Sequence, residues 1–312
     1  MQRDFLFGIL LCTACSLKLT AQEVPTTLIP SDLKIVQRIA DHEKLDSPPA
    51  SVDKGWPLKK GEKGIRFASN ENPRHALTVV PDANGRVTKL LGNGPLLCND
   101  ALKWAAELQE LRVIRIDHNI PHPGSKTPHM QYDGSGFSAF KTGKLEEIRI
   151  GHAFDDLGMA ALAQVKSLRM AIIVHSKATD LGIKHFENHP NLEEFEISSQ
   201  GRANRVTEKS LPIFATLPKL KRLALHETFL TYDQGLKHLA PLKGRLETVS
   251  LKGSLVLPED IDRLRRDHPN MTIVTSTPAE ILDSPNSRGV LKWASPKAIE
   301  YLTSGKQNPP SK

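Results

Sequence analysis

The chain has 312 residues, of which 39% are hydrophobic and 25% are charged, and its formal net charge is +7 at pH 7. This composition is typical of a folded globular protein and argues against a disordered or membrane-embedded chain. The 42 lysines and arginines are spread among 35 acidic residues, and only 5% of the residues are aromatic. A protein that binds nucleic acid is expected to have a basic face with aromatic side chains that stack on bases. We therefore expect no nucleic acid partner.

The first 21 residues have the pattern of a secretory signal. Arg3 precedes an apolar run, Phe5–Leu17, and Leu19–Gln22 offers a small-residue cleavage site after Ala21. The run has 13 residues, whereas a helix needs about 20 to cross a bilayer, so no stable membrane span is expected. We predict a signal peptide over residues 1–21 and a secreted or periplasmic (cell-envelope) product. An uncleaved anchor is the alternative.

The number and positions of the cysteines also favour an exported protein. Cys12 and Cys15 lie in the predicted signal, so the mature chain keeps only Cys98 and can form no internal disulfide. This favours a bacterial exported protein that is stabilised by packing alone. A lipoprotein signal ending at Cys15 is disfavoured because Cys12 stands where a leucine-like residue is expected.

Residues 22–75 are expected to form a helix and a linker. Pro30–Asp46 has helical periodicity, and Ser31 is positioned to cap the helix. The apolar side chains that share one face are Leu33, Val36, Ile39 and Ala40. Ser47–Gly64 is rich in proline, glycine and lysine, which is the composition of a linker.

A β-hairpin is predicted next, over Ala76–Gly92. Two runs of strand-forming residues flank Asp82-Ala-Asn-Gly85, and Asn and Gly accept the positive φ that tight turns require.

The pattern Leu-x-x-Leu-x-Leu, or a close variant, then recurs at intervals of 34, 23, 24, 28, 26 and 25 residues. Its copies are Leu111–Ile116, Leu145–Ile150, Leu168–Ile173, Leu192–Ile197, Leu220–Leu225, Leu246–Leu251 and the frayed Met271–Val274. A period in the twenties is typical of leucine-rich repeats, in which each copy supplies one strand of a stacked parallel sheet.

The segments between these strands have helical periodicity and a common start. Thr179, Thr207 and Thr231 stand where a side-chain oxygen can cap a helix. Cys98 occupies the equivalent place at the start of the predicted helical segment Cys98–Leu111. The predicted unit is therefore strand, loop, helix and loop. The interval of 34 residues indicates an insertion over Ile120–Gly136.

Residues 277–312 are expected to close the far end of the repeats. Ser295–Leu302 is predicted to form a covering helix with Trp293, and the final residues have the composition of a disordered tail.

The segment Ala76–Ser276 resembles the helix-rich leucine-rich repeats of ribonuclease inhibitors and F-box substrate receptors. It is most similar to exported repeat proteins of planctomycete-like bacteria, with their Thr-Asp-x-Gly-Leu units, and Gly85–Leu90 (GRVTKL) resembles a first repeat strand. The resemblance implies an α/β fold, a leucine-rich repeat solenoid with a curved parallel sheet on the concave side and helices on the convex side. The asparagine that usually follows each strand is kept at Asn119 and only loosely elsewhere.

In such strands the leucines face inward, and the third, fifth and seventh positions line the concave face. An apolar stripe at Met170, Ile172 and Val174 is expected between two charged borders, a composition that favours protein binding. The candidate partner-binding residues are Arg115, Glu147, Arg149, Met170, Ile172, Val174, Glu194 and Glu196. The alternative is that the chain itself covers the stripe, or that Arg149 and Glu196 pair across it.

No catalytic motif stands out in the sequence, and no cofactor or metal is expected. Gly134-Ser135-Gly136 is too short for a nucleophile elbow, and no phosphate-binding loop or His-Glu-x-x-His motif is present. We expect a non-enzymatic protein-binding module. The alternatives are a secreted hydrolase or carbohydrate-active protein that uses the 120–136 insertion, and an F-box-like substrate receptor. The insertion carries His122, His129, Tyr132 and Asp133, whose spacing matches no metal motif.

Overall fold

The computed structural model describes residues 27–53, 58–71, 75–93, 96–117, 132–151, 154–199, 205–284 and 287–304. The predicted signal peptide, most of the 120–136 insertion and the last eight residues lie outside these ranges. The described chain builds one sheet of 11 strands, and their order in the sheet follows their order in the sequence. The strands are β1 (Ala50–Val52), β2 (Gly64–Ala68), β3 (Ala76–Pro81), β4 (Val87–Asn93), β5 (Val113–Asp117), β6 (Glu147–Gly151), β7 (Met170–Ser176), β8 (Glu194–Ser199), β9 (Arg222–His226), β10 (Thr248–Leu251) and β11 (Thr272–Thr275).

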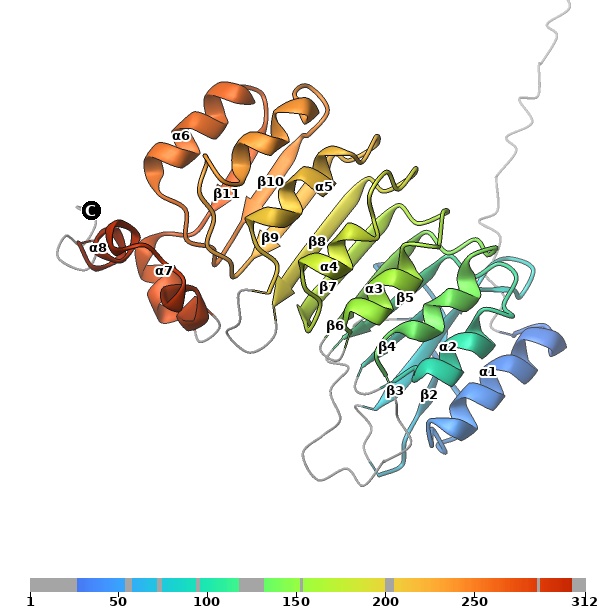
Figure 1. Ribbon diagram of the computed structural model, residues 1–312. Coiled ribbons are helices and arrows are strands. Elements are labelled where there is room, and N and C mark those ends of the chain that lie inside the picture. The colour runs from blue at the N-terminus through green and yellow to red at the C-terminus, as the bar shows by residue number, and fades with distance from the viewer. Residues whose placement is uncertain are drawn as a thin grey trace, which may run out of the picture.

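The sheet has an antiparallel start and a parallel body. β1 to β4 pair antiparallel, whereas every pair from β4–β5 to β10–β11 is parallel. Parallel neighbours require a crossover between them, and here each crossover carries a helix or a 3-10 turn. The α/β class is therefore confirmed, and the sheet does not close into a barrel (Figure 1).

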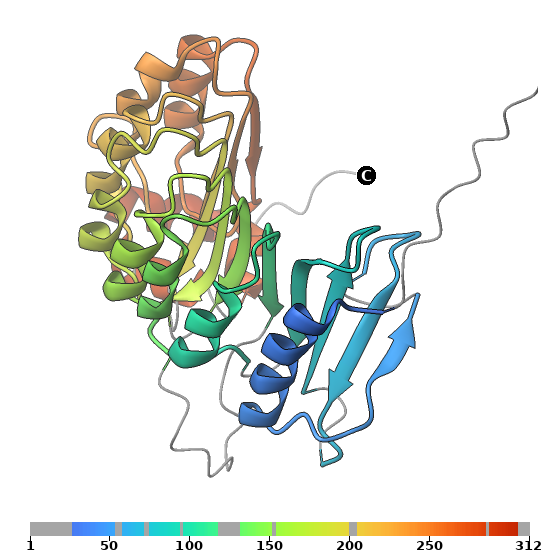
Figure 2. The same ribbon diagram turned by 90° about the vertical axis from the view of Figure 1, so that its right-hand side faces the viewer.

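Helices line one face of the sheet (Figure 2). These are α1 (Pro30–His42), α2 (Asn99–Ala105), α3 (Asp156–Leu162), α4 (Asp180–Lys184), α5 (Leu211–Ala215) and α6 (Pro258–Asp267), with the 3-10 helices Ser135–Phe140, Glu208–Ser210 and Leu236–Leu242. We call the opposite side of β4–β11, which carries the third, fifth and seventh positions of each repeat, the open face. No described helix has the length and apolarity to cross a bilayer.

The leucine positions form the core between the sheet and the helices. Leu145, two residues before β6, and Ile148 and Ile150 within it are all fully buried, and the equivalent leucine positions of the repeats from β5 to β10 are buried in the same way. Each such side chain contributes about 1.5–3 kcal/mol on burial. Although aromatic residues are scarce, phenylalanines also gather here, with the Phe195 ring 5.3 Å from that of Phe186 and 5.1 Å from that of Phe214.

The N-terminal segment differs from the prediction in two ways. Ser31 does not cap α1, because Pro30 already occupies the first turn and Ile29 is the N-cap residue; Leu33 is 44% exposed. The stretch predicted as a linker contains β1 and the start of β2, which extend the sheet because β2 pairs with β3 and β1 with β2. Composition alone did not indicate these strands because their stability comes from a neighbour that is distant in sequence.

The predicted hairpin is confirmed as β3 and β4. Gly85 has φ of 75°, whereas Asn84 does not adopt positive φ, so only the glycine uses that freedom. A Cβ at Gly85 would lie 2.9 Å from the main-chain oxygen of Thr27, so the position also requires a small residue. The buried Asp32 of α1 accepts a 2.9 Å hydrogen bond from the Val87 main-chain N–H and joins the helix to the hairpin.

The C-terminal segment forms a separate small core. It contains α7 (Pro278–Asp283), the 3-10 helix Ser287–Lys292 and α8 (Pro296–Ser304). Ala298 and Leu302 of α8 pack with Leu255 and Leu257, in the loop after β10. The predicted covering helix is therefore present, but Trp293 is 58% exposed and is not among the residues that pack in this core.

Candidate functional site

The predicted open-face residues lie side by side in the observed register. Glu147 pairs with Met170, which pairs with Glu194, and these three form one row across β6, β7 and β8. A second row runs through Arg149, Ile172 and Glu196. The order along each row places an apolar residue of β7 between charged residues of β6 and β8. Parallel pairing of identical repeat positions produces this arrangement, because the side-chain alternation is in phase in every strand.

The apolar stripe consists of Met170, Ile172 and Val174, each half-buried on the open face of β7. Neighbouring side chains cover part of these residues, so the stripe is less exposed than a surface loop and more exposed than the leucine core. Val174 lies at the end of the stripe and pairs with Gly151, which has no side chain to cover it.

The charged borders of the stripe are held by ion pairs within the sheet. Arg115 Nη2 lies 2.7 Å from Glu147 Oε2, and Arg222 Nη2 lies 2.6 Å from Glu194 Oε2. Because these pairs are partly exposed to water, each contributes little to stability, about 0–1 kcal/mol. Their effect is to fix the orientation of the side chains that border Met170.

A groove of about 140 Å³ crosses the first residues of β6 to β9 on this side of the molecule. It is lined by Glu146, Glu147, Arg169, Met170, Glu193, Glu194 and Arg222. Four carboxylates face two guanidinium groups, and Met170 is the sole apolar member of the lining. The groove therefore combines an apolar contact with a mainly acidic rim.

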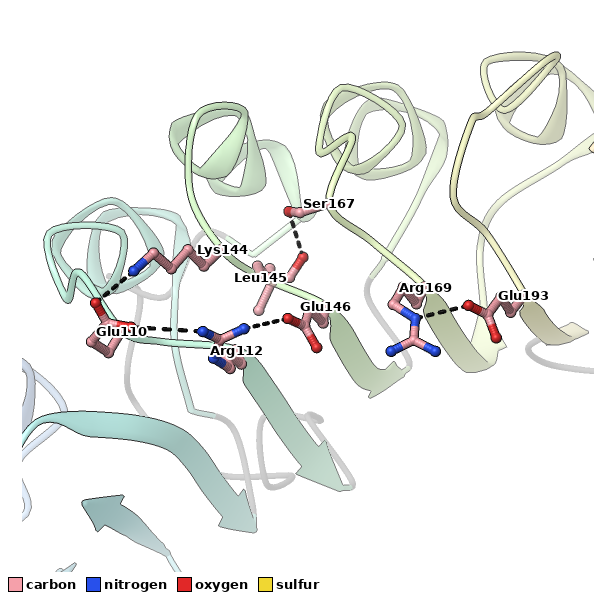
Figure 3. A network of polar contacts seen from close by, with 8 residues as sticks. All are labelled: Glu110, Arg112, Lys144, Leu145, Glu146, Ser167, Arg169 and Glu193. Carbon is pink, nitrogen blue, oxygen red and sulfur yellow. Dashed lines mark hydrogen bonds and ion pairs between the residues drawn. The ribbon is translucent and has the colours of Figure 1, made fainter. Parts of the chain in front are cut away.

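A ladder of ion pairs runs past this groove along the start of the strands (Figure 3). Lys144 contacts Glu110 at 2.6 Å, Arg112 contacts Glu146 at 2.5 Å, and Arg169 contacts Glu193 at 2.9 Å. The hydrogen bond from Arg169 holds the pKa of Glu193 below its usual value. The ladder links successive repeats at their surface.

The structure also brings together three side chains that the sequence did not single out as a group. His226 Nε2 lies 3.0 Å from Ser250 Oγ, and His226 Nδ1 lies 3.7 Å from Glu196 Oε1. Burial raises the pKa of Glu196, an effect that Arg149 partly offsets, and burial lowers the pKa of His226. Glu196 and Ser250 occupy the fifth position of their repeats, and His226 occupies the seventh position of the repeat between them. The repeat register alone could therefore have predicted that these three side chains lie close together on the open face.

The order of these groups is that of a hydrolase triad, but the surroundings are unlike an active site. Ser250 lies within β10, which pairs with β9 and β11 on its two sides. The sheet ladder uses the main-chain N–H groups of a central strand, so those of β10 are engaged in pairing, unlike the free N–H groups of an oxyanion hole. The contacts among Glu196, His226 and Ser250 are suited to holding these polar side chains in place beside the apolar stripe.

The N-terminal part of the open face is closed. Leu91 and Val113 are buried with Val80, and Leu58 packs against them. Lys89 Nζ lies 2.5 Å from Glu62 Oε1 and holds this covering segment over β4. The open face was predicted to be exposed to solvent, but at β4 and β5 the segment that contains Leu58 and Glu62 covers much of it.

Of the 120–136 insertion, the residues from Tyr132 onward are described, and His118, His122 and His129 lie outside the described ranges. Asp133 accepts hydrogen bonds from Asn99 Nδ2 at 2.9 Å and from the Ser135 N–H at 2.8 Å. This carboxylate fixes the end of the insertion to the start of α2.

Comparison with known proteins adds no assignment. No protein-family model matches the chain, and no curated protein is significantly similar to its sequence.

Proposed function

We propose that the chain is an exported, helix-rich leucine-rich repeat solenoid that binds a protein partner through the open face and has no catalytic activity. The solenoid assignment is supported by the strand order and by the pairing of equivalent repeat positions across β4–β11. The export assignment is supported by the pattern of residues 1–21.

One observation carries the binding role. Met170, Ile172 and Val174 form a half-exposed apolar stripe, and the residues that pair with Met170 and Ile172 on both neighbouring strands are charged. An apolar centre with a polar, charged rim is the usual composition of a protein interface. The expected partner segment has apolar side chains that cover the stripe and polar groups that meet Arg149 on one side and Glu196 on the other.

The test is capture of a partner from cell-envelope extract by the chain and by matched variants. Met170→Lys places an ammonium between Glu147 and Glu194, so the variant removes the apolar contact with little cost to folding. We expect it to reduce capture of the specific partner at least about tenfold, the equivalent of 1.4 kcal/mol of binding free energy. Ile172→Thr, which keeps a β-branched side chain, is expected to weaken capture in the same direction.

The control is Leu181→Lys on α4, because Leu181 is 71% exposed on the helix side. This variant should capture the partner as the unaltered chain does. The same set of captured proteins with Met170→Lys and with Leu181→Lys, at equal melting temperatures, would rule out the stripe as the binding site.

A further inference from the structure

Three side chains with metal-ligating atoms meet where the N-terminal helix joins the first repeat helix. His42 is the last residue of α1, Glu43 follows it, and Cys98 is the N-cap residue of α2. One ligating atom from each residue lies within 4.8 Å of the other two. Cys98 Sγ and His42 Nε2 are 3.2 Å apart. The chain separation is 56 residues between His42 and Cys98, so the fold, and not a local motif, brings these groups together.

The Glu43 carboxyl group is the second, independent feature of this place. The residue is 3% exposed, and Oε2 is buried without a hydrogen-bond partner. The other oxygen, Oε1, accepts from the Cys98 main-chain N–H at 3.2 Å. A buried carboxylate oxygen without a partner is costly unless a cation or a donor satisfies it.

The surroundings hold the three groups in place. The His42 ring packs edge-on against Trp104, with 5.1 Å between the ring centroids, and the Arg38 guanidinium covers the Trp104 ring at 4.1 Å. His75, the residue before β3, has its Nε2 2.9 Å from the main-chain oxygen of Glu43 and anchors that residue. Oriented ligands of this kind are what a metal site requires beyond its first contacts.

We propose that His42, Glu43 and Cys98 form a mononuclear Zn²⁺ site. Zn²⁺ takes thiolate, imidazole and carboxylate ligands, whereas Ca²⁺ and Mg²⁺ prefer oxygen ligands alone. Zn–S and Zn–N bonds of about 2.3 and 2.0 Å in a tetrahedral site place the two ligand atoms about 3.5 Å apart, close to the separation of Sγ and Nε2. Three protein ligands leave a fourth position for water, and His42 is the exposed member through which solvent reaches it.

The site joins the N-terminal cap to the repeat array. α1 and α2 are neighbours in the layer of helices, and Zn²⁺ bound between them would crosslink the end of one to the start of the other. The ends of a repeat array need capping, and a metal that binds only the folded state stabilises it by mass action. Binding displaces the thiol proton, because the thiolate is the ligand.

The experiment uses the full chain, stripped of metal with a chelator and then titrated with Co²⁺ as a spectroscopic probe for the Zn²⁺ site. We expect one equivalent to give visible d–d bands of tetrahedral Co²⁺ and a near-ultraviolet thiolate-to-cobalt band, both removed by excess Zn²⁺. Cys98→Ser keeps a side-chain oxygen for the helix cap and should abolish the thiolate band. Glu43→Gln should weaken Zn²⁺ binding by about tenfold or more. His185→Ala, a change at the exposed C-cap histidine of α4, should leave binding unchanged.

Thiol protection supplies a measurement that needs no variant. Alkylation of Cys98 in the unaltered chain, followed peptide by peptide with mass spectrometry, should slow at least about tenfold when one equivalent of Zn²⁺ is added. Peptide analysis separates Cys98 from Cys12 and Cys15. Equal alkylation rates with and without Zn²⁺, or a thiolate band that persists in Cys98→Ser, would overturn the site and leave a hydrogen-bonded junction between α1 and α2.

Discussion

His189 is one of two buried histidines among the described residues, the other being His268, and its protonation should affect the stability of the core. His189 follows α4, is 1% exposed, and its Nε2 lies 3.1 Å from the main-chain oxygen of Val165. A carbonyl can only accept, so Nε2 carries the proton, and Nδ1 is buried without a hydrogen-bond partner. A second proton on this ring would place a charge and an unsatisfied N–H in the core, which is why burial lowers the pKa of His189.

The free energy of unfolding should therefore depend on the protonation of His189. The unfolded chain binds this proton near pH 6.5 and the folded chain only at lower pH, so the folded state loses stability as the pH falls below about 6.5. His189→Gln retains a donor to Val165 and removes the titration. We expect the difference in unfolding free energy between the unaltered chain and the variant to shift in favour of the variant from pH 7.5 to pH 5, measured by denaturant unfolding in the presence of chelator. His185→Gln, at an exposed position, should follow the unaltered chain, and parallel curves for all three proteins would contradict the assignment.

At the scale of elements, successive helix starts are linked by a relay of carboxylates and threonines. Asp156 accepts from Thr179 N–H and Oγ1 at 2.7 and 2.8 Å, and Thr179 caps its own helix through the Leu181 N–H. Asp180 accepts from Thr207 in the same way, at 2.7 and 2.6 Å. Each hydroxyl donates to the preceding helix and accepts from its own, so both capacities of the group are used. The predicted threonine caps at residues 179 and 207 are confirmed, but the sequence did not reveal their carboxylate partners.

Asp180→Ala should show how much this relay contributes. The change removes the acceptor of both Thr207 bonds and of a third from Ser210 at 2.5 Å. Hydrogen bonds to a charged group contribute about 1.5–3 kcal/mol each and are not additive, so we expect a loss of about 2–3 kcal/mol in the free energy of unfolding. Asp180→Asn, which keeps one acceptor oxygen, should lose less. Lys184→Ala, at an exposed position of the same helix, is the control and should stay within about 0.5 kcal/mol. A similar loss for all three changes would exclude the relay as the cause.

The elements that the sequence predicted are those whose pattern repeats. The leucine period placed β5 to β10 and their registers, because alternation decides which side of a strand faces the core and equal repeats then stack in phase. β1 and β2 were not predicted because they belong to no repeating pattern and depend on pairing with the edge of β3. The open-face rows of Met170 and Ile172 were predictable for the same reason that the strands were. The meeting of His42 and Glu43 with Cys98 was not, because nothing local in the sequence sets the position of α1 against α2.

The described residues form one long core, a separate C-terminal cluster, and the small cluster of Val80, Leu91 and Val113 on the open face. The long core extends from α1 through the parallel strands to α6, whereas the C-terminal helices share a separate cluster with residues that follow β9 and β10. In a stacked array each unit contacts only its neighbours, so damage to a central unit reaches the units on both sides. A destabilising change in the C-terminal cluster should affect only the last units, and local unfolding of that cluster should leave the long core folded.

Hydrogen exchange of two variants should separate these cores. Leu220 is fully buried in the long core, and Leu220→Ala should lower the global free energy of unfolding by about 2–5 kcal/mol and reduce protection along β8 to β10 and beyond. Leu302 is fully buried in the small cluster, and Leu302→Ala should reduce protection in α7 and α8 while β5 to β8 keep the protection of the unaltered chain. If Leu302→Ala instead lowered protection uniformly across the sheet, the two clusters would unfold as one unit, and the C-terminal helices would be part of the core of the repeats. If Leu220→Ala left the melting temperature unchanged, the repeat register itself would be wrong, because that register places Leu220 where its side chain has no route to solvent.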